Sequence, residues 1–159
     1  MKKRIMFSVL IFAAAITSAQ KFPKLNYKVG LITSLPTDSY ADQSKVSIGS
    51  TMFEVYDSVS KKIDITLNAA YLRYTNSGES FAQIVLMPGA RYHINSLFHF
   101  GANVGAAGYN RKDIGKLDFI YSPFIGLTAG KITIDVRYLN TVKGEKSIKT
   151  NTLSFLYTL

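Results

Sequence analysis

The 159-residue chain is basic, with 19 lysine and arginine residues against 10 aspartate and glutamate residues and a formal net charge of +9. It contains no cysteine, which excludes disulfides, thiol chemistry and a lipid-modified N-terminal cysteine. Its length suits one domain and is short for two.

The N-terminal residues have the three parts of a secretory signal peptide. Basic residues at 2–4 precede an apolar run over 5–16, and small residues end the segment at Ala19. A membrane-spanning helix is the alternative, but it would need about 20 apolar residues. We therefore expect a signal peptide over residues 1–19 and one mature domain over residues 20–159.

The remaining chain alternates between apolar and small or polar residues with a period of two, which is typical of strands with two unlike faces. Globular strands average about 5 to 6 residues, whereas a tilted membrane-spanning strand needs about 9 to 11. Eight runs with this pattern, each of ten or more residues, cover 25–34, 45–56, 63–75, 81–93, 97–109, 117–130, 132–141 and 147–159. The pattern predicts an all-β fold, an eight-stranded antiparallel up-and-down transmembrane β-barrel.

The connections between these runs alternate in character. Segments 35–43, 76–80, 110–116 and 142–146 are polar and comparatively long, whereas those between them are short. Outer-membrane barrels have long outer loops, short periplasmic turns and an even number of strands. We therefore expect both termini on the periplasmic side.

The less apolar face of the runs indicates which side meets lipid. A soluble barrel would carry lysine and glutamate on that face, but here it holds small residues such as Gly101, Asn103 and Gly105. The opposite face is a continuous apolar band, with Phe98 and Phe100 in the same run. We expect the band to face lipid and the small polar residues to line the lumen.

Two runs change phase, and bulges near Gly49 to Thr51 and near Ala69 to Ala70 would restore their alternation. A charge facing lipid at mid-strand is costly, so we expect the strand charges to point inward and pair there. The predicted lumen network consists of Lys28, Glu54, Asp64, Arg73, Arg91, Asp118, Asp135 and Arg137.

The segment ending "TSAQ", the eight runs and the terminal "LSFLYTL" together resemble the small outer-membrane β-barrels of the OmpA and OmpX transmembrane type, especially those of Bacteroidetes-like bacteria. The resemblance implies an outer-membrane location, with the last strand closing the barrel against the first. It also implies that the barrel-assembly machinery reads the last strand, through Leu153, Phe155, Tyr157 and Leu159.

No pattern of catalytic, metal-binding or cofactor-binding residues stands out. His93 falls near a turn and His99 on the inward phase, where a histidine needs a positioned nucleophile to do chemistry. The lipid A deacylase of similar size and fold carries a His-x-Ser pair near its C-terminus, whereas the run over 132–141 contains neither residue. We therefore expect a non-enzyme without cofactor or metal.

The sequence favours a structural or surface-interaction role in an outer membrane. Basic residues near the outer ends of strands can bind anionic headgroups, although an ordinary solvated loop would look the same. The candidate lipopolysaccharide-contacting loop residues are Arg111, Lys112, Lys116, Lys143, Lys146 and Lys149. A narrow diffusion channel and a lipid-modifying enzyme remain the alternatives. We expect a monomer that contacts membrane lipid or a partner and binds no nucleic acid.

Overall fold

A computed structural model describes residues 25–37, 44–45, 47–76, 79–109, 117–143 and 146–159. Within these ranges the chain forms nine strands and no helix long and apolar enough to cross a membrane. The strands are β1 (Asn26–Pro36), β2 (Ser44–Lys45), β3 (Ser47–Ser58), β4 (Ile63–Asn76), β5 (Glu79–His93), β6 (Phe98–Tyr109), β7 (Asp118–Ala129), β8 (Ile132–Lys143) and β9 (Lys146–Thr158).

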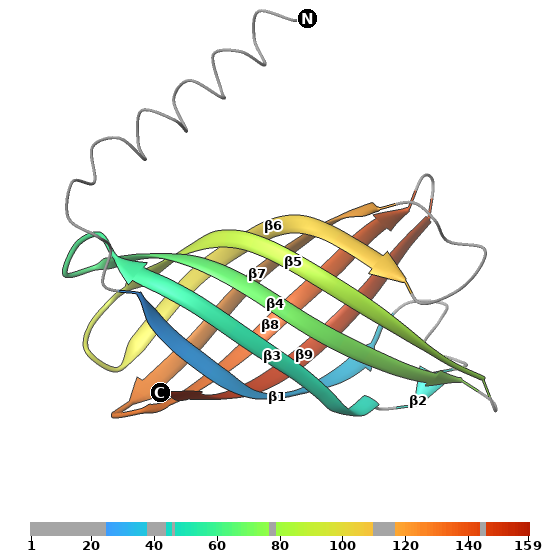
Figure 1. The fold of residues 1–159 in the computed structure, drawn as a ribbon, viewed down its shortest axis with the longest axis horizontal. Coiled ribbons are helices and arrows are strands. Elements are labelled where there is room, and N and C mark those ends of the chain that lie inside the picture. The colour runs from blue at the N-terminus through green and yellow to red at the C-terminus, as the bar shows by residue number, and fades with distance from the viewer. Residues whose placement is uncertain (1–24, 38–43, 46, 77–78, 110–116, 144–145) are drawn as a thin grey trace, which may run out of the picture.

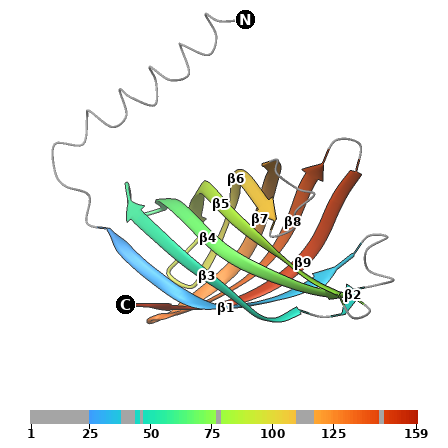
Figure 2. The same cartoon turned by 45° about the vertical axis from the view of Figure 1, so that its right-hand side comes forward.

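The strands close into an antiparallel barrel (Figures 1 and 2). Each strand from β3 to β8 pairs with the next along the chain. β1 pairs with both β3 and β9, which closes the ring. The short β2 pairs with the end of β4 beyond β3, so it extends the β3 position rather than adding a wall strand. This arrangement confirms the predicted eight-stranded up-and-down barrel.

The barrel has two unlike ends. At one end, which we call the turn end, lie the short connections 59–62, 94–97 and 130–131 together with the start of β1 and the end of β9 (Figure 1). Gly130 has a φ of 59°, a left-handed conformation that glycine adopts without steric cost. At the opposite, loop end, the pairing continues to Asn76–Glu79 and Lys143–Lys146. Two of the four expected long loops are therefore reduced to residues 77–78 and 144–145.

Alternation along the strands separates an apolar outer wall from a polar interior. On β6, for example, Phe98, Phe100 and Val104 are exposed, whereas His99 and Asn103 are fully buried. Apolar side chains dominate this outer wall. Such a composition is expected of a surface that faces lipid, where a charged side chain at mid-height would be costly. The predicted placement of the apolar band on the outside is confirmed.

The structure confirms one of the two expected bulges. β1 residues Ile32 and Ser34 pair with Ser50 and Ser47, so β3 carries one residue more than β1 across this interval. The extra residue restores the phase of β3 and turns Glu54 inward.

The second expected bulge, near Ala69 to Ala70, is wrong. β4 pairs with β5 in unbroken register from Ile63 to Asn76, and its inward phase continues through Leu72 and Tyr74. Arg73 therefore points outward and is exposed, so its assignment to the lumen is corrected. Without an extra residue, two successive side chains on a strand must point to opposite faces.

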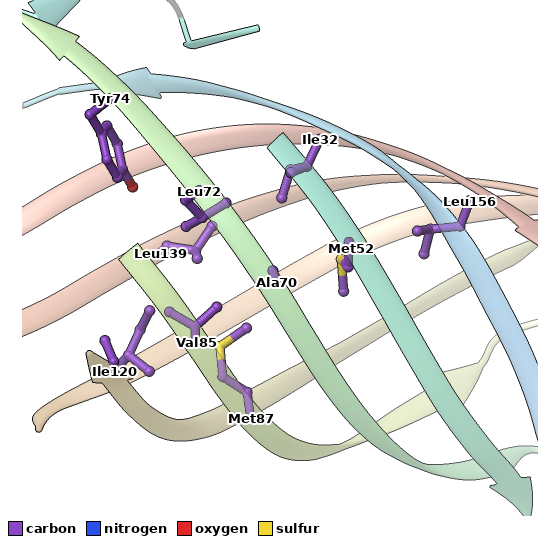
Figure 3. Packing of buried hydrophobic residues seen from close by; sticks show 11 residues of the cluster. Ile32, Met52, Ala70, Leu72, Tyr74, Val85, Met87, Ile120, Leu139 and Leu156 are labelled. Carbon is purple, nitrogen blue, oxygen red and sulfur yellow. The ribbon is translucent and has the colours of Figure 1, made fainter. Parts of the chain in front are cut away.

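Buried apolar side chains fill much of the lumen, most of them toward the loop end, which the sequence interpretation did not predict. Figure 3 shows Leu72, Met52, Val85 and Leu139 converging from different strands. The full cluster is Ile32, Met52, Ala70, Leu72, Tyr74, Val85, Met87, Ala107, Ile120, Leu139 and Leu156. The interior therefore has an apolar layer as well as a polar one.

Candidate functional site

A buried network of charged side chains occupies the lumen between the apolar layer and the turn end. At its centre, Arg91 Nη2 donates to both carboxylate oxygens of Glu54, at 2.6 and 2.8 Å. Arg137 Nη2 donates to Asp135 Oδ2 at 2.6 Å and lies 3.7 Å from Glu54 Oε2. Lys28 Nζ lies 3.4 Å from Glu54 Oε1. Glu54 thus connects cations from three strands.

The network extends at both sides to a histidine. On one side, Arg91 Nη1 lies 3.5 Å from Asp64 Oδ2, and His93 Nε2 lies 2.8 Å from the same oxygen. On the other side, His99 Nε2 lies 2.7 Å from Asp135 Oδ1. The two imidazole rings belong to paired residues of β5 and β6, with centroids 5.8 Å apart. The contacts therefore run around the inner wall and return to their starting point.

Neighbouring uncharged residues hold the two arginines in place. The Phe124 ring lies 4.3 Å from Arg137 Cζ and 5.8 Å from Arg91 Cζ, within cation–π range of both guanidinium groups. Arg137 Nη1 donates to Asn103 Oδ1 at 3.1 Å, and Asn103 Nδ2 donates to Thr66 Oγ1 at 2.9 Å. These polar contacts extend the network to side chains without charge.

Glycine makes room for the His99–Asp135 contact. A Cβ at Gly126 would collide with Asp135 Oδ1, His99 Nε2 and the Ile134 carbonyl oxygen. Gly126 pairs with His99 on one side and with Asp135 on the other, so all three meet at one height of the wall. A side chain there would force one of the two partners out of position.

Formal charges within the network balance. The three carboxylates belong to Glu54, Asp64 and Asp135, and the three lysine and arginine side chains are those of Lys28, Arg91 and Arg137. An unpaired buried charge costs several kcal/mol, so a balanced set with short contacts is the form in which charges are tolerated here. Because its charges are already paired, the network is better explained as packing that fills the lumen than as a binding site for an ion.

The apolar layer lies nearer the loop end than the charges on the same strands. On β1, Ile32 lies beyond Lys28, and on β8, Leu139 lies beyond Arg137. Still nearer the loop end, Tyr74 Oη donates to Gln83 Oε1 at 3.3 Å. Successive polar and apolar layers thus occupy the interior.

A pocket of about 620 Å³ opens at the turn end, below the charged layer. Within it, Ser58 Oγ donates to Asp64 Oδ1 at 2.7 Å, while His93 binds the other oxygen of Asp64. In a catalytic triad the histidine lies between the serine and the carboxylate. Here the carboxylate lies between the serine and the histidine, so His93 is not placed to activate Ser58. In the part of the chain that the structure describes, no group of His, Asp or Glu residues is arranged for a metal ion.

The structure brings together six of the eight residues predicted for the lumen network, namely Lys28, Glu54, Asp64, Arg91, Asp135 and Arg137. Asp118 is half-buried at the loop end of β7, where its Oδ2 makes no hydrogen bond to the described residues. Arg73 lies on the outer wall, as described above. The pairings join residues far apart in the chain, and His99 contributes a contact that its inward phase alone did not indicate.

The predicted loop residues fall into three groups. Arg111, Lys112 and Lys116 lie outside the described residues. Lys143 and Lys146 are strand residues that pair with each other at the loop end, and Lys149 is an exposed residue of β9. The assignment of Lys143, Lys146 and Lys149 to a loop is corrected, because the β8–β9 ladder continues as far as the pair Lys143 and Lys146.

Comparison with known proteins gives matches to solved structures only. No protein-family model matches the sequence, and no curated protein matches it. Ail, the attachment invasion locus protein of Yersinia pestis, in complex with the heparin analogue sucrose octasulfate, is similar with a TM-score of 0.63 and 13% identity, over 85% of this chain and 97% of Ail. Neisserial surface protein A gives a TM-score of 0.62 and 13% identity, over 85% of this chain and 96% of that protein. The outer membrane enzyme PagL gives a TM-score of 0.63 and 14% identity, over 83% of this chain and 99% of PagL.

The chain has the fold of a small outer-membrane β-barrel. The predicted resemblance is thereby confirmed at the level of the fold, and the exposed apolar band supports the predicted outer-membrane location. Since PagL is an enzyme of similar fold, the architecture does not by itself distinguish a catalytic from a non-catalytic barrel.

Proposed function

We propose that the protein is an integral outer-membrane barrel with a non-conducting lumen, which serves a structural or surface-interaction role at its loop end. The observation that carries this proposal is the filling of the lumen. Paired charges such as Arg91 and Glu54 occupy one layer, and apolar side chains such as Leu72 and Leu139 occupy the next. An eight-stranded barrel has an interior just wide enough for side chains to fill, unlike porins with about 16 to 18 strands.

Planar-bilayer recording tests this proposal. The purified, folded protein should give no steady conductance steps, whereas a porin reconstituted in the same lipid gives them. Folding is checked beforehand by a shift in gel migration on boiling, because a closed barrel resists detergent unfolding. Steady ion-conducting steps from the folded protein would favour the diffusion-channel alternative and contradict the proposal.

Basic residues near the loop end are the proposed means of surface interaction. Ail, which has a similar fold, was crystallised with a polyanionic heparin analogue. In this chain, Lys143, Lys146 and Lys149 cluster at the β8–β9 end, and Arg111, Lys112 and Lys116 belong to the segment between β6 and β7. We propose that these residues contact lipopolysaccharide or another anionic partner. Vesicles carrying the protein should bind lipopolysaccharide or heparin less tightly after all six are changed to glutamine, and unchanged binding would contradict this role.

The proposal includes the absence of catalysis. The Ser58–Asp64–His93 contacts do not place the imidazole against the hydroxyl, and the two histidines bind carboxylates of the charge network. Incubation of the reconstituted protein with lipid A, followed by mass spectrometry, should leave the lipid mass unchanged. A mass change that disappears in His93→Ala would instead favour the enzyme alternative.

A further inference from the structure

The outer wall of the barrel contains a hollow of about 340 Å³ across β1, β3, β4 and β5. Its floor is formed by Thr51 and Ala69, two small residues on outward positions of adjacent strands. Register explains the shape, because Thr51 pairs with Tyr71 and Ala69 pairs with Phe53. The two aromatic side chains therefore stand on opposite corners of a patch whose other corners are small.

Large apolar residues complete the border of the hollow. Val29 pairs with Phe53 across the β1–β3 ladder, and Ile84 pairs with Tyr71 across the β4–β5 ladder. Both side chains are exposed, at 45% and 61%. An apolar chain lying in the hollow would contact side chains on both flanks, which increases dispersion contacts relative to a flat wall.

On β4, Arg73 occupies the next outward position beyond Tyr71, at the loop-end border of the hollow. It follows Tyr71 by two residues on the same face of β4, and it is exposed on the outer wall. Its backbone N–H donates to Ser50 Oγ at 3.0 Å beside the β3 bulge. Within the described residues, no carboxylate forms a salt bridge with its side chain.

The height of Arg73 matches the headgroup region of a membrane. Arg73 is ten residues beyond Ile63, where β4 begins at the turn end. At about 3.4 Å per residue and a strand tilt of about 40°, this corresponds to about 25 Å along the barrel axis, similar to the height of the apolar band of such barrels. A guanidinium group at that level meets phosphate groups, to which arginine can donate two parallel hydrogen bonds.

We propose that this hollow binds one acyl chain of a membrane lipid whose anionic phosphate headgroup pairs with Arg73. The inference rests on the proposed membrane placement of the barrel, with lipid against its outer wall. Shape and charge favour the same occupant, because an apolar hollow ends at a cation at the expected headgroup level. A second copy of the chain would bring its own apolar band into the hollow but no phosphate to Arg73.

Retention of lipid by the folded barrel tests the proposal. The full mature chain is folded into vesicles of equal parts phosphatidylcholine and phosphatidylglycerol, released in mild detergent and examined by native mass spectrometry. We expect preferential retention of one phosphatidylglycerol. Arg73→Gln should lower that preference about fivefold, the factor that one basic residue contributes at an anionic membrane surface. Ala69→Leu, which fills the hollow, should lower retention of both lipids.

Matched variants separate this site from general effects. Ala102→Leu enlarges an exposed outward alanine on β6, and Lys61→Gln removes an exposed charge from the turn end, at the opposite end of β4 from Arg73. Both should retain lipid like the unmodified protein. Equal lipid preference in Arg73→Gln and the unmodified protein, or a dimer that Ala69→Leu disrupts, would overturn the inference. A chain that fails to insert into vesicles, with no migration shift on boiling, would instead contradict the proposed membrane placement.

Discussion

Arg91 on β5 and Glu54 on β3 form a buried ion pair, in which a single guanidinium nitrogen lies 2.6 and 2.8 Å from the two carboxylate oxygens. Their strands are not neighbours, because β4 lies between them in the wall. The pair therefore crosses the inner surface of β4 and joins parts of the barrel that the backbone ladder does not connect directly. Its loss should affect the stability of the whole barrel.

Glu54→Ala should lower the free energy of unfolding by about 3 to 5 kcal/mol, because it leaves buried Arg91 and Lys28 without their shared carboxylate. Urea titration of the protein folded in phospholipid vesicles measures the change. Asp57→Ala removes a less buried carboxylate from the same strand and should cost less than about 1 kcal/mol. Equal losses in the two variants would mean that the network contributes little to stability.

Gly126→Ala should destabilise the barrel by about 1 to 3 kcal/mol, since the added methyl group collides with the His99–Asp135 contact. Gly108→Ala provides a matched control, because a Cβ there would meet only Leu117 Cδ2, at an ordinary 3.6 Å. The same urea titration compares them. If Gly126→Ala unfolds at the same urea concentration as Gly108→Ala, the close packing around His99 is not needed for stability.

Leu72→Ala should cost about 2 to 5 kcal/mol, because it opens a cavity in the apolar layer of the lumen. On the same strand, Leu67→Ala removes a lipid-facing side chain that is 42% exposed and should cost less. Comparing the two variants by urea titration also tests the register of β4. Similar, small losses from the two variants would place Leu72 on the outer wall beside Leu67, as the expected bulge near Ala69 to Ala70 would, and would contradict this register.

Much of the fold could be predicted because its determinants are local. Strand length, period two and the spacing of turns are readable from neighbouring residues, and they gave eight strands and the lipid-facing band. The phase of β4 could not be predicted in the same way. Leu72 and Tyr74 are apolar, and in a barrel surrounded by lipid an apolar residue is compatible with either face. Pairing with β5 in unbroken register decides the phase, and that information lies in another strand.

The charge network was predictable in membership but not in contacts. Charges at mid-strand favour the lumen on energetic grounds, which identified Glu54, Arg91 and Asp135. Which charges meet depends on the register of neighbouring strands, which brings Arg91 to Glu54 across β4, and on barrel closure through β1 and β9, which brings Arg137 to Glu54. His99 was expected on the inward phase, but its 2.7 Å contact with Asp135 depends on the alignment of β6, β7 and β8, which the sequence does not give.

Removal of residues 153–159 should prevent formation of the barrel. This segment supplies much of the pairing of β9 with both β8 and β1, including Phe155 with Leu31 and Ile134. Its loss leaves two unpaired edges, which favour aggregation.

We also propose that the assembly machinery reads the outward residues Leu153, Phe155, Tyr157 and Leu159. Phe155→Ala combined with Tyr157→Ala should therefore slow insertion in cells while permitting folding of purified protein in vesicles. Fractionation of a Gram-negative host and gel migration before and after boiling measure both effects. Normal insertion of the truncated chain would contradict the closure argument, and normal insertion of the double variant would contradict only the recognition role.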